Sequence, residues 1–191
     1  MARNRWYDAN IPISFWDIGM SEFKGPSELL KAYEHIVGNI GSFYDDGVNV
    51  CFAGTHGIGK TLTSTNILKF ACLKNYSCCY TTFADMISAL ISSPFDEQYN
   101  AKKQLVMSDF LVVDEVDPRH IGKGLAEDLY GRALDNIFRT RSQNKIPSII
   151  ITNSPNVIET FSGAIKESLG SLMSKMKVIS VRGEDYRKTN K

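Results

Sequence analysis

The sequence predicts an α/β fold in which a five-stranded parallel sheet is covered by helices on both faces. Five short apolar or β-prone segments alternate with stretches whose apolar residues recur at helical spacing. The segment 110–113 is continuously apolar, which is typical of a central strand in a parallel sheet. A length of 191 residues with 43% hydrophobic and 23% charged residues suits one globular domain with a short extension.

The N-terminal part, residues 1–44, is predicted to be an extension of the domain that occupies 45–191. Residues 1–26 contain many aromatic and apolar side chains and are expected to form an extended leader that packs on the domain. Ser27 is a plausible N-cap for a helix over 28–40, whose apolar residues have helical spacing. A turn at 45–47 then leads into the first strand.

The remaining elements follow from apolar runs and breaks in the pattern. Strands are expected at 48–53, 78–82, 110–113, 147–153 and 177–181. Helices are expected at 62–73, 83–91, 96–107 and 124–144, with further helical segments across 157–176. This alternation places the carboxyl ends of all five strands at one edge of the sheet, where ligands of such folds bind.

Composition excludes several classes of protein. The net charge of +1 gives no global field for nucleic acid, so a DNA-binding surface has to be a local patch. The N-terminus has no apolar signal region, and no apolar run approaches the roughly 18 residues of a membrane span, so a cytoplasmic protein without a membrane partner is expected. Four cysteines without C-x-x-C spacing and three histidines favour buried, reduced thiols over a zinc site.

Residues 54–61 match the phosphate-binding pattern G-x-x-x-x-G-K-[ST] between a predicted strand and a predicted helix. In such a P-loop, backbone N–H groups and a helix N-terminus surround phosphate oxygens. Lys60 would reach the β- and γ-phosphates of ATP, and the Thr61 hydroxyl would bind Mg²⁺. His56 occupies a variable position and is given no catalytic role. The residues expected to contact ATP here are Gly54, Thr55, His56, Gly57, Ile58, Gly59, Lys60, Thr61 and Leu62. The N-terminal extension, residues 1–44, is expected to pack near the base of this nucleotide.

Two further strand ends carry suitable polar residues. Asp114 and Glu115 end the third strand, as in a Walker B motif. Asp114 is therefore expected to hold the Mg²⁺ shell through water, and Glu115 to polarise the attacking water as a general base or an orienter. Asn153 ends the fourth strand, where its amide can bridge the water and the γ-phosphate. A solvated acidic turn and an Asn-Ser-Pro turn are the simpler alternatives.

Cationic residues offer less specific signals. An arginine from a neighbouring subunit can offset charge on the γ-phosphate, and Arg132, Arg139 and Arg141 are candidates, although helix-surface arginines are usually just solvated. A single-stranded DNA path is conceivable at Lys102 and Lys103, given the aromatic residues Tyr80, Phe83, Phe95 and Tyr99 nearby in sequence. Lys123, Arg187, Lys188 and Lys191 are further basic residues, and a solvated surface explains all of them equally well.

Together, residues 54–61, 111–115, Arg141 followed by 147–153, and the near-terminal segment 183–187 resemble the AAA+ ATPase domain of replicative-helicase loaders of the DnaC/DnaI type and of the transposition helper IstB. The resemblance implies an AAA+/ASCE sheet in the order 5-1-4-3-2 and ATP-dependent self-association on single-stranded DNA. It implies that Asn153 is sensor 1 and Arg141 the arginine finger. Lys175 occupies the sensor 2 position, where the family usually has an arginine whose planar fork a lysine lacks.

The expected function is therefore an ATPase with Mg²⁺ that assembles as a homo-oligomer on single-stranded DNA and loads or remodels a DnaB-type helicase. About 45 residues precede the first strand, so the helicase-docking module of the cellular loaders is expected to be missing or reduced. Three alternatives remain open: an IstB-like helper acting on duplex DNA, a P-loop nucleotide kinase, and a binding module with a relic ATP site.

Overall fold

The computed structural model describes residues 2–91, 94–117, 125–154 and 163–183. Its centre is a five-stranded sheet in the order β2-β3-β4-β1-β5, and all four pairs of neighbouring strands are parallel. This confirms the predicted sheet and its order. The strands are β1 (Val50–Gly54), β2 (Cys78–Thr82), β3 (Phe110–Asp114), β4 (Ser148–Thr152) and β5 (Lys177–Val181).

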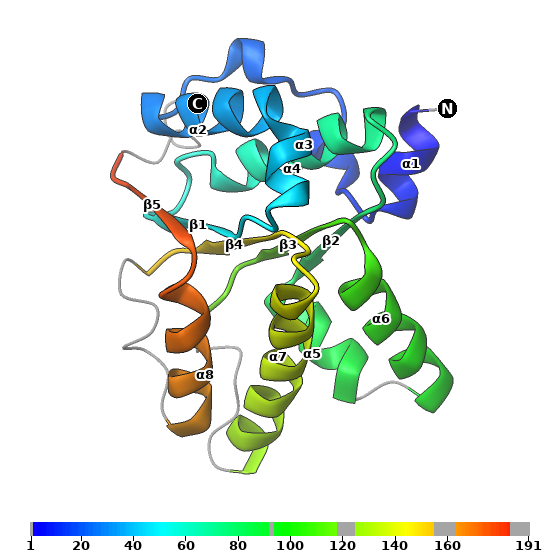
Figure 1. Ribbon diagram of the computed structural model, residues 1–191. Helices are drawn as coiled ribbons and strands as arrows, with labels where there is room; N and C mark the ends of the chain where they lie inside the picture. Colours follow the sequence, from blue (N-terminus) through cyan, green and yellow to red (C-terminus); the bar gives the residue numbers. More distant parts are fainter. Residues whose placement is uncertain (1, 92–93, 118–124, 155–162, 184–191) are drawn as a thin grey trace.

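Helices cover both faces of the sheet (Figure 1). One layer contains α1 (Ala2–Asp8), α2 (Ser27–Gly38), α3 (Ile40–Asp45) and α4 (Lys60–Leu73). The other contains α5 (Phe83–Ile91), α6 (Phe95–Met107), α7 (Leu125–Gln143) and α8 (Gly163–Met173). Side chains of a strand alternate between the two cores, since Val50 and Phe52 face the first layer while Cys51 and Ala53 face the second.

The leader is not extended, and that expectation is wrong. It contains α1 and two short 3₁₀ turns, Ile13–Phe15 and Met20–Glu22. It does pack on the domain, because Trp6, Trp16 and Phe23 contact the first core. Ser27 is the first residue of α2 rather than its N-cap, and the predicted single helix over 28–40 is interrupted at the non-helical Asn39.

The sheet presents its carboxyl edge to three connections that carry the predicted chemistry. β1 leads through residues 55–59 into α4, β3 ends at Asp114, and β4 ends at Thr152, one residue before Asn153. Because β4 lies between β1 and β3, side chains at these three ends face a common space.

Candidate nucleotide-binding site

The loop between β1 and α4 depends on glycine at two positions. Gly54 lies so close to β5 that a Cβ atom there would sit 2.1 Å from the Val181 carbonyl oxygen. Gly59 has φ +98°, in the left-handed region that glycine adopts without strain, and a Cβ atom there would meet the Phe23 ring at 2.5 Å. The loop can therefore close tightly and deliver its N–H groups to the start of α4, where orphan helix donors favour an anion.

Lys60 joins the P-loop to the end of β4. Its side chain is only 4% exposed. Its ammonium donates to the carbonyl oxygens of Gly54 at 2.9 Å and Thr55 at 2.6 Å. It also donates to Asn153 Oδ1 at 2.9 Å, which brings the sensor candidate to the P-loop lysine. Two residues that are 93 positions apart in sequence thus share one site.

Asp114 is buried and fully engaged by hydrogen-bond donors. Its Oδ2 accepts a hydrogen bond from the Thr61 hydroxyl at 2.8 Å and from the Tyr80 hydroxyl at 2.9 Å. Its Oδ1 accepts from the backbone N–H of Glu115 at 2.7 Å. Burial, followed by the charge of Asp114, raises the pKa of Tyr80, which keeps that hydroxyl protonated as a donor. Sequence reasoning missed Tyr80 as a site residue, because its contact depends on the β2–β3 register.

Glu115 differs from its neighbour in both exposure and backbone conformation. The residue is exposed at the rim of the site, directly after the buried Asp114. Its φ is +55°, a region in which a non-glycine residue is uncommon. Strained residues of this kind cluster at functional sites, where the surrounding structure holds a side chain in a required direction. The turn aims Glu115 at the cavity rather than into the core.

All these groups line one cavity of about 410 Å³. The leader supplies part of its wall, and the side of α4's first turn supplies another. The lining residues are Phe15, Ile18, Phe23, Lys24, Gly25, His56, Gly57, Ile58, Gly59, Lys60, Thr61, Leu62, Asp114, Glu115 and Asn153. Hydrogen-bond donors suited to phosphate, a pair of carboxylates and an apolar wall thus surround one cavity, which suits a nucleoside triphosphate.

The hydroxyl of Thr61 and the carboxylate of Asp114 fit a magnesium ion. Both are hard oxygen ligands, and they already meet at 2.8 Å beside the P-loop. Among the described residues, no three His, Cys, Asp or Glu side chains form a metal-binding group. A cation here would thus take its other ligands from phosphate oxygens and water, as Mg²⁺ usually does.

Arg141 lies away from this site and is inaccessible to a neighbouring subunit, which argues against its expected role as an arginine finger. It is completely buried and donates to the Ser148 hydroxyl and to the backbone oxygens of Leu105, Val106, Pro147 and Ser108. These groups lie where β3 and β4 begin, at the edge opposite the P-loop. Burial lowers the pKa of Arg141 to about 10. The side chain therefore has a structural role and links the end of α6 to the starts of β3 and β4.

Lys175, the residue at the expected sensor 2 position, also lies away from the P-loop. It is exposed, and it lies two residues before β5 begins at Lys177, the residue paired with Val50 at the start of β1. This is the amino edge of the sheet, whereas the P-loop follows the far end of β1. Lys175 lines a groove between α7 and α8 instead. Lys175 is therefore not among the residues that line the nucleotide cavity of the chain, and its expected sensor 2 role stays a prediction.

Two other arginines of the long helix α7 remain at the surface. Arg139 is bound to Asp135 through two hydrogen bonds of 3.0 and 2.7 Å. Arg132 is exposed one helical turn before Asp135. Of the aromatic residues considered for DNA, Tyr80 and Phe83 are buried, while Phe95 and Tyr99 are exposed. Lys123, Arg187, Lys188 and Lys191 lie outside the described residues, as does most of the near-terminal segment 183–187.

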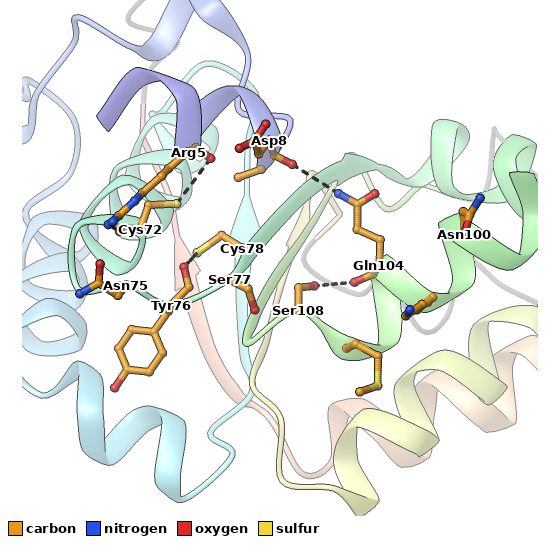
Figure 2. A pocket seen from close by; sticks show the side chains of 13 residues that line it. Arg5, Asp8, Cys72, Asn75, Tyr76, Ser77, Cys78, Asn100, Gln104 and Ser108 are labelled. Carbon is orange, nitrogen blue, oxygen red and sulfur yellow. Dashed lines mark hydrogen bonds between the residues drawn. The ribbon is translucent and has the colours of Figure 1, made fainter. Parts of the chain in front are cut away.

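A second cavity of about 620 Å³ lies between α1, the end of α4, the start of β2 and α6 (Figure 2). Gln104 reaches across it to the Asp8 carbonyl oxygen at 3.5 Å. It is lined by Cys78, the first residue of β2, whereas Thr82 at the other end of β2 pairs with Asp114. This cavity therefore lies away from the carboxyl edge and contains none of the predicted ATP contacts.

The parallel sheet, the P-loop after β1 and the acidic pair after β3 define a P-loop nucleotide-binding protein of the AAA+ class. The chain belongs to the family of IstB-like ATP-binding proteins, whose family model matches residues 35–191. No curated protein sequence matches the chain. In the described parts of the chain, no helix has the length and apolar character required to cross a membrane.

Solved structures share this fold. A crystal structure of the DnaC helicase loader matches with a TM-score of 0.70 at 16% identity, over 89% of this chain and 99% of that one. The crystal structure of DnaI matches with a TM-score of 0.69 at 14% identity, over 92% and 93% of the two chains. The replication initiator DnaA bound to AMPPCP and single-stranded DNA gives 0.68 at 17% identity, over 92% of this chain but only 50% of that one.

Proposed function

We propose that the protein is an ATPase that assembles with ATP on single-stranded DNA and loads or remodels a DnaB-type replicative helicase. The observation that carries the ATPase part is the convergence of Lys60, Thr61, Asp114, Glu115 and Asn153 on one cavity. A chance glycine-rich turn would have no reason to meet an acidic pair and an amide from two other strands.

The residues divide the work of hydrolysis according to their chemistry. The ammonium of Lys60, now held by carbonyl oxygens and Asn153, is placed to donate to phosphate oxygens instead. Glu115 orients and deprotonates the attacking water, and Asn153 holds that water toward the γ-phosphate. Thr61 and Asp114 would hold Mg²⁺, which would neutralise charge on the phosphates.

The surface that supports DNA binding lies on α6. Phe95 is 81% exposed and Tyr99 is 62% exposed, and they are four residues apart on one helix face. Lys102, three residues further, lines the same groove between α6 and α7. Exposed aromatic rings beside a cation suit stacked bases and a phosphate backbone, because every base has a π-face.

Assembly would bring a cation of one subunit to the phosphates of the next. With Arg141 buried, Arg132 is the candidate from the original three that is both exposed and outside the Asp135 pair. Arg132→Ala subunits should bind ATP normally but hydrolyse it slowly in the assembly. Mixing them with Glu115→Gln subunits should restore activity at interfaces that combine an intact Arg132 with an intact Glu115; no restoration would argue against a trans contribution from Arg132.

The test of the whole proposal is size measurement by light scattering with a non-hydrolysable ATP analogue, with and without single-stranded or duplex DNA. Assembly that requires the analogue and single-stranded DNA is expected. Lys60→Ala should lose nucleotide binding and assembly, whereas Glu115→Gln should assemble yet hydrolyse ATP about 10²- to 10⁴-fold more slowly. A monomer under every condition would contradict the proposal. The Phe95→Ala/Tyr99→Ala variant removes the exposed aromatic pair on α6 and tests its part in assembly on single-stranded DNA.

Membership of the IstB-like ATP-binding family leaves a second candidate, a transposition helper that acts on duplex DNA. The ATP site would be the same, so the DNA arm of the experiment decides between the two. Assembly promoted by duplex DNA, and unaffected by loss of Phe95 and Tyr99, would select this candidate. A nucleotide kinase is disfavoured, because the chain belongs to the family of IstB-like ATP-binding proteins.

A further inference from the structure

Lys69 is a buried lysine for which the hydrolysis scheme has no use. It lies on α4, nine residues after Lys60, and its side chain is 7% exposed. Its ammonium donates to three backbone oxygens of the leader: Phe15 at 2.8 Å, Trp16 at 3.2 Å and Ile18 at 2.7 Å. The ammonium also lies 5.5 Å from the centre of the Trp6 ring.

Burying the charged ammonium of Lys69 costs free energy, because the charge loses its hydration. Burial lowers the pKa of Lys69, although the more distant charge of Asp17 acts in the opposite direction. Within the described parts of the chain, no carboxylate lies within ion-pair distance of Lys69. A lysine ammonium has three N–H donors, and three leader carbonyls receive them. The contact orders a loop rather than pairing two charges.

The ordered loop forms part of the nucleotide cavity. Phe15 and Ile18, two of the residues whose carbonyl oxygens Lys69 holds, also line the cavity that contains Lys60 and Thr61. One helix, α4, thus presents the phosphate-binding residues in its first turn and fixes the leader wall from a position about 13 Å further along its axis. The polar groups Lys60, Thr61 and Asp114 suit the phosphates, which leaves the apolar leader wall for the base.

We propose that Lys69 is a positioning residue that holds Phe15 and Ile18 as the wall against which the base of a bound nucleoside triphosphate packs. This inference rests on the proposed ATP site. It makes phosphate recognition and base recognition separable, because the P-loop stays intact when Lys69 is changed, whereas the leader wall does not.

The test compares ATP with inorganic tripolyphosphate, which has the phosphates but no base, by calorimetric titration in the presence of Mg²⁺. Lys69→Met keeps the length of the side chain but removes its donors. It should weaken ATP binding about tenfold, equivalent to about 1.4 kcal/mol, and leave tripolyphosphate binding unchanged. Lys69→Arg keeps the donors and should recover most of the ATP affinity. Lys74→Met, which removes an exposed lysine beside the Phe70 ring, is the matched control and should bind both ligands normally.

The two tryptophans of the chain, Trp6 and Trp16, both lie beside Lys69 and provide a direct readout of the leader. Their emission should shift to longer wavelength in Lys69→Met but not in Lys74→Met, because the leader becomes more hydrated. If Lys69→Met fails to fold, Phe15→Ala and Ile18→Ala test the same wall with Lys69 intact, and the same loss of ATP binding without loss of tripolyphosphate binding is expected.

The outcomes separate the inference from its premise. Wild-type protein that binds neither ATP nor tripolyphosphate overturns the proposed ATP site itself. Suppose that the wild-type protein binds both ligands. Unchanged ATP affinity in a folded Lys69→Met protein, or in both leader-wall variants, then overturns the role of Lys69 alone. Equal weakening of ATP and tripolyphosphate would also overturn it, because the lysine would then support the P-loop and not the base wall.

Discussion

At the scale of single residues, the Asp114 carboxylate shows how a strand end gathers hydrogen-bond donors from three parts of the chain. Thr61 comes from the P-loop helix, Tyr80 from the edge strand and the Glu115 N–H from the chain itself, and all three donate to this one side chain. A buried carboxylate needs such donors, since an unsatisfied buried charge is strongly unfavourable. Tyr80 remains a donor whether or not Thr61 turns to a metal, so it fixes the orientation of Asp114.

Tyr80→Phe should therefore weaken the magnesium dependence of nucleotide binding without removing the P-loop. Loss of an outer hydrogen bond to a metal ligand commonly lowers metal affinity by about tenfold or more. The measurement is a magnesium titration of ATP-analogue binding. Tyr44→Phe is a matched control, because it removes another tyrosine hydroxyl whose pKa is raised by a neighbouring aspartate, Asp109, away from the site. An unchanged magnesium midpoint in Tyr80→Phe would show that Asp114 is held without it.

Arg141 is expected to affect stability, whereas its sequence position suggested an effect on hydrolysis between subunits. Arg141→Ala leaves several buried carbonyl oxygens without donors, and we expect a loss of about 3 kcal/mol of stability. The melting temperature should fall by roughly 6–12 °C. Arg139→Ala, two residues earlier on α7, removes only an exposed ion pair and should barely change it. A stable Arg141→Ala protein with impaired oligomeric hydrolysis would instead reinstate Arg141 as a finger.

The residues that sequence could identify are those whose role is encoded locally. Lys60 and Thr61 stand in a motif, and Asp114 and Glu115 end an apolar run, so their meeting follows from parallel strand topology. Arg141 resembles a surface arginine in sequence, and only the tertiary packing of α6 and β4 around it makes it a core residue. The roles of Tyr80 and Lys69 depend on strand register and on the path of the leader, which no local pattern contains.

At the scale of elements, α4 links the parts of the site. Polar residues on it are buried as fully as apolar ones, because the sheet, α2 and the leader surround it. This is why its pattern shows no amphipathic stripe. Its boundaries were nevertheless predictable to within two residues, since the P-loop fixes its start and Asn75, with φ +69°, follows its end. The leader was harder, because its short helix and 3₁₀ turns depend on α4 for support.

The approach of the leader to the P-loop predicts the effect of Gly59→Ala. A left-handed φ costs a non-glycine residue about 2 kcal/mol, and the new Cβ atom would also press on the Phe23 ring. The melting temperature should fall by at least ~4–8 °C. Adding Phe23→Ala removes the clash but not the backbone strain. The double variant should therefore lose less stability than the sum of the losses in the two single variants. Strict additivity would show that Phe23 does not press on this loop.

At the scale of the whole molecule, the two edges of the sheet have different tasks. The carboxyl edge carries the cavity and the exposed Glu115, while the amino edge is closed by the buried Arg141 and its carbonyl partners. Between them, the strands contribute apolar residues and three buried thiols, while the fourth, Cys72, lies on α4; all four cysteines are free and buried. The sequence predicted this division at the carboxyl edge, where topology alone gathers the strand ends. It did not predict the contacts at the amino edge, because the single side chain of Arg141 makes them.

The buried thiols predict how stability depends on alkaline pH. Burial raises the pKa of Cys51 to about 12 and that of Cys79 to about 11, although the charge of Arg141 opposes the shift at Cys79. An unfolded thiol ionises near pH 8.5, so the unfolded state loses protons that the folded state keeps. Their stabilisation is therefore complete below about pH 8.5 and is lost as the pH rises toward the folded pKa values. The lowered pKa of Lys69 acts in the opposite sense, since raising the pH relieves the cost of burying its charge.

Urea unfolding at fixed pH values between 8.5 and 10 measures this effect before most unfolded tyrosines ionise. The free energy of unfolding should fall by up to about 1.4 kcal/mol per pH unit for each thiol. A Cys51→Ala/Cys79→Ala variant is less stable at neutral pH but should show a clearly flatter decline over this interval. If wild type and variant decline in parallel, the two thiols ionise equally in both states, and the packing of this central core around them is looser than the structure indicates.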